Sequence, residues 1–198
     1  MDTPAVQVGM PLEEYIRLYD SEGPFEIIDG ERIPKMPTVA GHGYTLKIIY
    51  FALSLYASAQ KLGEVLSELP FVLSYMSDWV TGSRIPDVMY YTAERIDAYK
   101  ASNPDWKKKP YILVPDLAIE VISPTDNLSE VDEKIDRYLI DGVNAVWTLD
   151  PQQEKVSLYT LISLQPFTKQ QTTLKVGDTL IGGEIIPGFE IPVATLFE

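Results

Sequence analysis

Apolar positions along the chain recur at two spacings, one typical of helices and one typical of strands. Between residues 44 and 60 they recur every three or four residues, which predicts the best amphipathic helix of the chain, ending at Gly63. These positions are Leu46, Ile49, Tyr50, Leu53 and Ala57. Two shorter helices are predicted at residues 11–19 and in "TAERIDAYK", where Thr92 is expected to cap the helix.

A fourth helix is predicted to begin near Ser129, which we interpret as its capping residue, with Asp132 at the third position. Its apolar face consists of Val131, Ile135, Tyr138 and Leu139. Asp141 and Gly142 are expected to end it.

Short or alternating apolar runs predict the strands. "PFEIIDGERIPKMP" predicts a hairpin that turns at Asp29-Gly30. "EVLSELPFVLSY" and "RIPDVMYY" are predicted to pair antiparallel through the turn "MSDWVTGS", and "AVWTL" and "KVSLYT" flank the hairpin turn "DPQQE". The last part of the chain predicts short strands separated by glycine and proline. Helices alternating with strands and hairpins indicate an α/β fold of the mixed α+β kind, with a mixed central sheet flanked by helices.

The chain length fits a single domain, residues 1–198, because 198 residues suffice for one sizeable core. Hydrophobic residues make up 45% of the chain, but no apolar stretch approaches the roughly 20 residues of a membrane span. The N-terminal "MDTPAVQVGMPLEEY" lacks the basic and apolar regions of a signal peptide. We therefore expect a cytoplasmic protein with no membrane partner.

The net charge and the residue types restrict which kinds of active site and which partners the chain can have. The chain has no cysteine and a single histidine, His42, which excludes disulfides, thiolate metal sites and cysteine nucleophiles. Any catalysis must therefore use carboxylates, lysine or hydroxyls. The net charge of −13 repels a phosphate backbone unless a basic patch or bound cations intervene. The one basic run, "WKKKP", fits a solvated loop better than a nucleic-acid patch.

Glu120 stands out because it lies in a predicted strand, residues 117–123, whose two faces both look buried. A lone carboxylate there costs several kcal/mol, about enough to force its protonation, unless a cation or strong donors accompany it. Asp116 lies on the same face but roughly 13 Å away, so it fits a strand-start residue better. Asp87, in a neighbouring predicted strand, is close enough to share a hard cation such as Mg²⁺ or Mn²⁺ with Glu120.

Lys134 borders the apolar face of the fourth helix and lies one turn before Tyr138, so its amine has access to the same place. The sequence leaves an alternative open, in which Lys134 is a surface residue paired with Glu130. Asp87 likewise has the alternative of an ordinary turn residue.

Several stretches in this order resemble one family. They are "PDV" from Pro86, "PDLAIEVISPTD" from Pro115, "DGVNAVW" from Asp141 and "LDP" from Leu149, together with Lys134 and Tyr138. The chain resembles the Uma-two family of restriction-endonuclease-like proteins, a branch of the PD-(D/E)XK nuclease superfamily. The resemblance extends from "FEIIDGE" to "IIPGFEIPVATLF" and implies a restriction-endonuclease-like core.

The resemblance also implies site residues. Asp87 matches the motif aspartate and Glu120 the acidic residue of the (D/E)XK element, both as metal ligands for Mg²⁺ or Mn²⁺. The lysine position two residues after Glu120 holds Ile122, so Lys134 would supply the catalytic lysine from the helix.

Two further residues match positions of the family. Glu26 matches an N-terminal glutamate that could approach the metal, and His42 matches a histidine often found just before the long helix. The alternatives are an ordinary hairpin residue for Glu26 and an ordinary loop or helix residue for His42.

The expected function is a metal-dependent endonuclease that hydrolyses phosphodiester bonds in nucleic acid, DNA above all, and acts as a homodimer. Two alternatives stay open. A catalytically silent binding or interaction module fits the acidic composition and Ile122, and a metal-dependent hydrolase of another substrate relies less on surface charge.

Overall fold

The computed structural model describes residues 8–74 and 78–198, which form two compact units. The first unit draws on residues up to Pro37 and on Pro70–Ile85 and Pro104–Val114. The second draws on Thr38–Leu69, Pro86–Asn103 and Pro115–Glu198. The single domain expected from the sequence stays a prediction.

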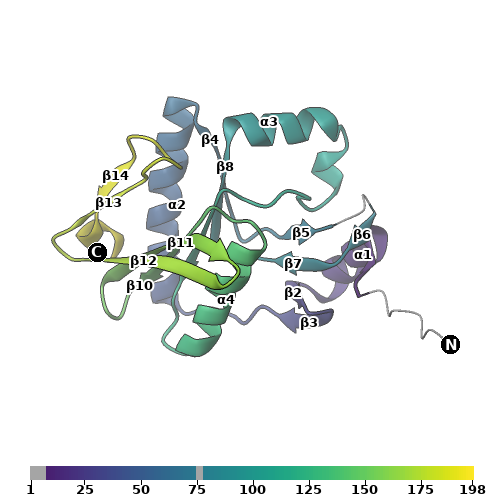
Figure 1. The fold of residues 1–198 in the computed structure, drawn as a ribbon, viewed down its shortest axis with the longest axis horizontal. Helices are drawn as coiled ribbons and strands as arrows, with labels where there is room; N and C mark the ends of the chain where they lie inside the picture. The colour runs from purple at the N-terminus through teal and green to yellow at the C-terminus, as the bar shows by residue number, and fades with distance from the viewer. Residues whose placement is uncertain (1–7, 75–77) are drawn as a thin grey trace. The chain divides into compact units, whose positions relative to one another are not determined.

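A six-stranded mixed sheet forms the centre of the second unit, in the order β12-β11-β10-β9-β8-β4 (Figure 1). Only the β9–β10 pair is parallel, and the other neighbours are antiparallel. The strands are β4 (Gly63–Ser67), β8 (Val88–Thr92), β9 (Leu117–Val121), β10 (Ala145–Asp150), β11 (Lys155–Leu164) and β12 (Phe167–Lys175). This arrangement confirms the mixed α/β fold predicted from the sequence.

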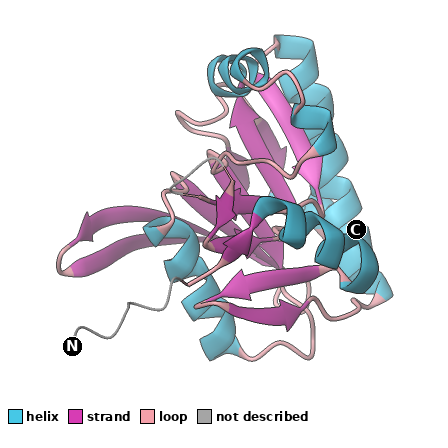
Figure 2. Cartoon of the chain, turned by 90° about the vertical axis from the view of Figure 1, so that its right-hand side faces the viewer, coloured by secondary structure: helices cyan, strands magenta, loops and turns pink. Residues whose placement is uncertain are grey.

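Helices cover both faces of this sheet. α2 (Ala40–Gln60) packs Ile49, Leu53 and Ala57 into a core shared with one face of β9. That face carries Leu117, Ile119 and Val121, as the predicted alternation requires. α4 (Leu128–Ile140) lies against the other face, where its side chains contact Glu120. In Figure 2, α2 is the long helix at the right and the β11–β12 hairpin extends to the left.

The C-terminal part of the chain completes the core beside α2. It contains β13 (Thr179–Ile181), β14 (Glu190–Pro192) and the short helix η2 (Val193–Leu196). Its apolar side chains join the same core, and they are Leu180, Ile186, Phe189, Ile191, Val193 and Leu196. α3 (Ala93–Ser102) follows β8 directly, with Thr92 at the predicted N-cap position but without a side-chain capping hydrogen bond.

The first unit contains a four-stranded antiparallel sheet, in the order β3-β2-β7-β5. Its strands are β2 (Phe25–Ile28), β3 (Glu31–Pro34), β5 (Phe71–Leu73) and β7 (Gly82–Arg84). α1 (Leu12–Glu22), the pair β1 (Met10–Pro11) and β6 (Trp79–Val80), and the short helix η1 (Trp106–Lys108) complete the unit. The predicted turn at Asp29-Gly30 is confirmed, since both residues have positive φ between β2 and β3.

Two predictions about strands and turns need correction. "EVLSELPFVLSY" forms two strands rather than one, β4 and β5, which belong to different sheets. Pro70 stands between them, preceded closely by Glu68 with a φ of 53°, and both interrupt an extended strand. The predicted turn "MSDWVTGS" contributes β6 and β7 instead, and its residues 76 and 77 lie outside the described part.

The boundaries of two helices also differ from the prediction. The N-cap of α4 is Asn127, whose side chain accepts a hydrogen bond from Ser129 N, so Ser129 is not the cap. α2 begins at Ala40, which places His42 inside the helix rather than before it. It ends at Gln60, where Lys61 adopts the left-handed conformation, so Gly63 does not end it. None of the helices formed by residues 8–74 and 78–198 has the length and hydrophobicity that a membrane crossing needs.

Candidate active site

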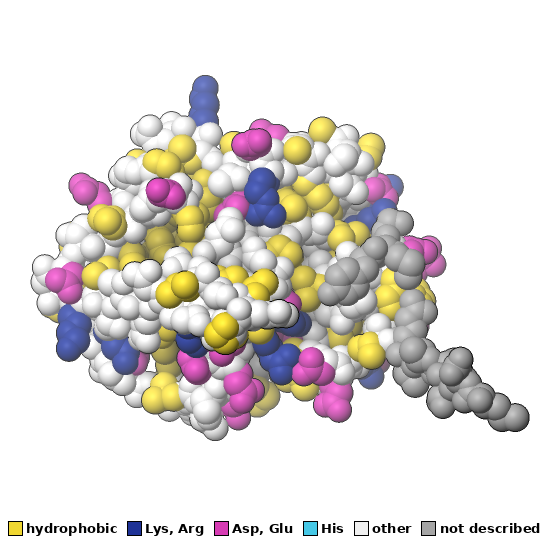
Figure 3. Space-filling model, viewed as in Figure 1, with side chains coloured by type: hydrophobic (Ala, Val, Ile, Leu, Met, Phe, Trp, Pro, Cys, Tyr) yellow, Lys and Arg dark blue, Asp and Glu magenta, His cyan; other side chains and the backbone are white. Residues whose placement is uncertain are grey.

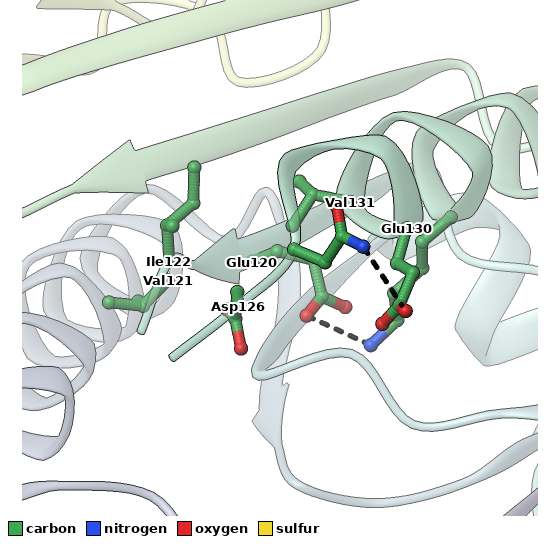
Figure 4. Close-up of a pocket in the computed structure, with 8 residues that line it drawn as sticks. Glu120, Val121, Ile122, Asp126, Glu130 and Val131 are labelled. Carbon is green, nitrogen blue, oxygen red and sulfur yellow. Dashed lines mark hydrogen bonds and ion pairs between the residues drawn. The ribbon is translucent and has the colours of Figure 1, made fainter. Parts of the chain in front are cut away.

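Glu120 contacts two side chains of α4, Tyr138 and Lys134. Figure 4 shows the contact with Lys134 as a dashed line. The hydroxyl of Tyr138 donates to Glu120 Oε1 at 2.6 Å, and Lys134 Nζ donates to Oε2 at 3.0 Å. Only 12% of the Glu120 side chain is exposed. The prediction that this carboxylate needs a partner is therefore confirmed, and the partners present are an ammonium group and a hydroxyl.

The position of Lys134 follows from helix geometry. Lys134 and Tyr138 are four residues apart on α4, so they lie on the same face and approach Glu120 together. Lys134 pairs with Glu120, and Glu130 Oε1 accepts a hydrogen bond from Asn127 Nδ2 at 3.5 Å. Figure 4 shows these two contacts as separate dashed lines.

Asp87 lies directly before β8 and is almost fully buried. Its Oδ2 accepts a hydrogen bond from Val121 N at 2.8 Å, so the side chain extends the β8–β9 ladder where the strand pairing stops. The same oxygen lies 2.9 Å from Nε2 of His42, which is also buried. These contacts give Asp87 more than the role of a turn residue.

His42 reaches Asp87 because α2 starts early. The residue is the third of the helix, and its ring points from the first turn toward the start of β8. His42 Nε2 lies within hydrogen-bonding distance of the carboxylate, and which of the two groups donates depends on the tautomer of the ring. Sequence reasoning matched His42 to the family but did not predict this contact with Asp87.

The two acids occupy adjoining positions on neighbouring strands. Val88 is paired with Ile119 in the antiparallel β8–β9 ladder, so the next residues outward are Asp87 and Glu120. Residues opposite each other in such a pair have Cα atoms about 5 Å apart. Their carboxylates bind side chains from different helices, α2 for Asp87 and α4 for Glu120.

A pocket of about 170 Å³ opens beside Glu120 and Lys134 (Figure 4). Val121 and Ile122 from the end of β9 line it, together with Asp126 and Glu130 near the start of α4. Asp126 was not predicted as a site residue, and its carboxylate accepts a hydrogen bond from Ser123 N at 2.8 Å, which shapes the turn after β9.

The donor chemistry fits a hard divalent cation in part. Two carboxylates on adjoining strands suit Mg²⁺, which proteins usually hold through one or two carboxylates while water and phosphate oxygens complete the shell. Within residues 8–74 and 78–198, however, no group of three or more His, Cys, Asp or Glu side chains is placed to hold a metal ion. Asp87 and Glu120 as metal ligands stay a prediction.

Glu26 lies in the first unit, unlike the four other candidates. Its carboxylate accepts a hydrogen bond from Ile85 N at 2.7 Å, within that unit. This contact gives Glu26 a structural role in linking β2 to the segment after β7. A role near the metal stays a prediction.

Asp116 confirms its interpretation as a strand-start residue. Its buried carboxylate accepts hydrogen bonds from Thr92 N, Arg95 and Asn144 at 2.7–3.0 Å. These contacts join the ends of β8 and β9 to the loop before β10. The acid is thus engaged at the opposite end of β9 from Glu120.

A comparison with family models decides to which family the chain belongs. A model described as "Putative restriction endonuclease", Uma2, matches residues 12–194. The chain belongs to the Uma2 family. This confirms the family suggested by the sequence motifs, and it supports a nuclease-like function for this Uma2 protein.

A solved structure has the same fold. It is a crystal structure from Anabaena variabilis described as a putative nuclease belonging to DUF820, and the match covers 95% of this chain and 97% of that chain. The TM-score is 0.74 and the sequence identity is 19%, so the likeness shows a shared fold. A comparison with curated proteins gives no match.

Proposed function

We propose that this Uma2 protein is a metal-dependent endonuclease that hydrolyses phosphodiester bonds in DNA, with Asp87, Glu120 and Lys134 at its centre. The contact between Lys134 and Glu120 is the observation that carries the proposal. It brings an ammonium group to an acid at the end of a strand, in a chain whose family model is described as "Putative restriction endonuclease". Ile122 leaves the usual lysine position of the strand apolar, and Lys134 supplies the charge from α4.

Asp87 and Glu120 would hold the cation. A bound Mg²⁺ or Mn²⁺ would polarise the substrate phosphate and lower the pKa of a bound water. Lys134 lies at the pocket wall, where its amine stabilises negative charge that builds on a phosphate in the transition state. The amine also offsets the negative charge of Glu120, which it contacts at 3.0 Å.

Tyr138 and His42 act as positioning residues in this proposal. The Tyr138 hydroxyl fixes Glu120 Oε1, and the His42 ring fixes Asp87 Oδ2. Because both Tyr138 and His42 are buried, each carboxylate is oriented by a side chain that has little freedom to move.

A non-catalytic binding module is the second candidate, and two observations favour it. The net charge of −13 disfavours approach to DNA, and Ile122 occupies the lysine position of the strand. On the face drawn in Figure 3, Lys and Arg side chains lie among Asp and Glu side chains rather than in one basic patch. The cytoplasmic location expected from the sequence stays a prediction.

Nicking of supercoiled plasmid DNA tests the proposal. The purified full chain is incubated with Mg²⁺, Mn²⁺ or EDTA, with a structured RNA as a parallel substrate. We expect metal-dependent nicking that falls about 100-fold or more in Glu120→Gln and in Lys134→Met, because each removes a charge that acts on the transition state. Titration calorimetry with Mn²⁺ alone gives an independent measure of the ligands, since Glu120→Gln should weaken the binding.

Glu133→Gln is the matched control, because Glu133 is an exposed acid on the same helix. It should nick like the native chain. Native protein that binds DNA but nicks it with neither metal contradicts the nuclease proposal and supports the binding module. Equal nicking by the native chain and Glu120→Gln removes Glu120 from the site.

A further inference from the structure

The outward face of α2 is an apolar stripe that residues 8–74 and 78–198 leave exposed. Tyr44 is 63% exposed, Phe51 60% and Leu55 76%, and Ile48 between them is partly exposed. At 3.6 residues per turn these four positions fall on one line along the helix. Tyr44, Phe51 and Leu55 lie opposite the side that packs on the sheet, which carries Ile49, Leu53 and Ala57. Ile48 is partly buried and also packs against that core.

The composition of α2 is unusual for a helix with an exposed face. Its 21 residues include one charged side chain, Lys47, and no carboxylate. Charged residues make up 23% of the whole chain. A helix that is apolar on all sides is normally covered on all sides, whereas a surface helix carries charges on its outer face.

Other parts of the second unit cover the two flanks of α2 and leave the stripe between them. On one flank, the Tyr56 hydroxyl donates to Pro187 O at 3.0 Å and its ring packs edge-on against Phe189. On the other flank, Tyr50 and Ser54 line a pocket with residues of β4 and α3. Within the part of the chain that the structure describes, the stripe therefore stays exposed between these two flanks.

We propose that the stripe binds the same stripe of a second copy, with the two α2 helices antiparallel across a two-fold axis. The spacing of the four residues is four, three and four, which reads the same from either end. In an antiparallel pair Tyr44 therefore meets the partner's Leu55, and Ile48 meets the partner's Phe51. Each contact joins an aromatic to an aliphatic side chain and occurs twice, as a self-complementary interface requires.

Charge favours a second copy over a charged partner. Copies of a chain with a net charge of −13 repel one another over most of the surface, but α2 brings no acid to the contact. Lys47 lies beside the stripe with its amine 5.2 Å from the ring centre of Tyr44. Its alkyl stem therefore adds apolar cover while its charge stays at the edge.

The area is sufficient for a modest dimer. Large side chains bury about 150–250 Å² each when fully covered, so the exposed parts of Tyr44, Phe51 and Leu55 offer about 400 Å² per copy. A symmetric pair then buries about 800 Å² from these residues, and Ile48 and the neighbouring small residues bring it toward the ~1,000 Å² of a specific interface. The contact leaves the α4 side of the sheet, with Glu120 and Lys134, open.

Analytical ultracentrifugation of the full chain tests the proposal over a range of concentrations. We expect a mass of two chains for the native protein and of one chain for Leu55→Glu at the same concentration. Ile162→Glu is the control, since Ile162 is 63% exposed on β11, away from α2. It should remain a dimer. A native chain that sediments as one chain at every concentration overturns the proposal, as does a dimer unchanged by Leu55→Glu.

Disulfide formation tests the antiparallel register separately, because the chain has no cysteine of its own. Positions 44 and 55 lie about 16 Å apart along one helix, too far for a bond within one copy. In the double variant Tyr44→Cys/Leu55→Cys each cysteine meets its counterpart of the partner subunit, so oxidation should link two copies. Tyr44→Cys alone should not link them. Crosslinking by the single variant, or none by the double variant, contradicts the register. The proposal does not depend on nuclease activity.

Discussion

The hydroxyl of Tyr138 offers a direct measure of how strongly the fold holds Glu120. Tyr138→Phe removes this donor and keeps the ring, which is fully buried. A hydrogen bond to an ionised acceptor contributes about 1.5–3 kcal/mol. Lys134 continues to donate to the other oxygen, and the open pocket admits water, so we expect a loss near the lower bound, about 1.5 kcal/mol. For a chain of this length that lowers the melting temperature by about 3–6 °C.

A double-mutant cycle with Glu120→Ala separates this contact from general loss of packing. Unfolding by urea, followed by circular dichroism, gives the free energy of unfolding for the native chain, both single variants and the double variant. We expect a coupling energy of about 1 kcal/mol or more, because each substitution removes the partner of the other.

Tyr90→Phe is the matched control for the cycle. Tyr90 is also buried, but its hydroxyl donates to a neutral carbonyl, Leu62 O, at 2.7 Å. Its side chain belongs to the core on the α2 side of the sheet, away from Glu120. Paired with Glu120→Ala it should show a coupling energy below about 0.5 kcal/mol. If the coupling energy between Tyr138→Phe and Glu120→Ala were also below about 0.5 kcal/mol, Tyr138 would not position the carboxylate.

Two further predictions concern contacts outside the candidate site. Burial by itself lowers the pKa of Lys169, but its hydrogen bonds with Asp132 and Asp136 on α4 outweigh burial and raise that pKa. Lys169→Met should therefore lower the melting temperature at neutral pH by about 2 °C. The difference from the native chain should vanish as the pH rises beyond the raised pKa of Lys169, above 10.5. A difference in melting temperature that persists there would show that the charge is not responsible. Asp116→Ala should lower the free energy of unfolding in urea by about 3 kcal/mol, because it leaves buried donors without their acceptor. Mn²⁺ binding measured by calorimetry should not change. Weaker Mn²⁺ binding would make Asp116 part of the metal site.

The approach of Lys134 to Glu120 could be predicted because strand and helix periodicity are local signals. Alternation in β9 separated Leu117 and Ile119 from Glu120, and the face of α4 brought Lys134 and Tyr138 to the same side. Both steps depend only on residues within one element.

The Asp87–His42 contact could not be predicted in the same way. It requires α2 to begin at Ala40, although "AGHGY" contains two glycines, which favour a loop over a helix. Tertiary packing of α2 on the sheet overrides that local preference. The same limit explains β4 and β5, which are close in sequence but pair with strands of different units.

Ile122 and Lys134 show that contacts in the structure identify the lysine next to Glu120, whereas the motif spacing points to position 122. Ile122 follows Glu120 by two residues, so a strand-borne lysine there would run alongside the carboxylate on the same face. That face is covered by α4, and Ile122 is buried at the pocket wall. Lys134 reaches Glu120 from above the sheet, and its side chain remains partly exposed beside the pocket. A charged amine keeps contact with water in this arrangement, which lowers the desolvation cost that a lysine at position 122 would carry.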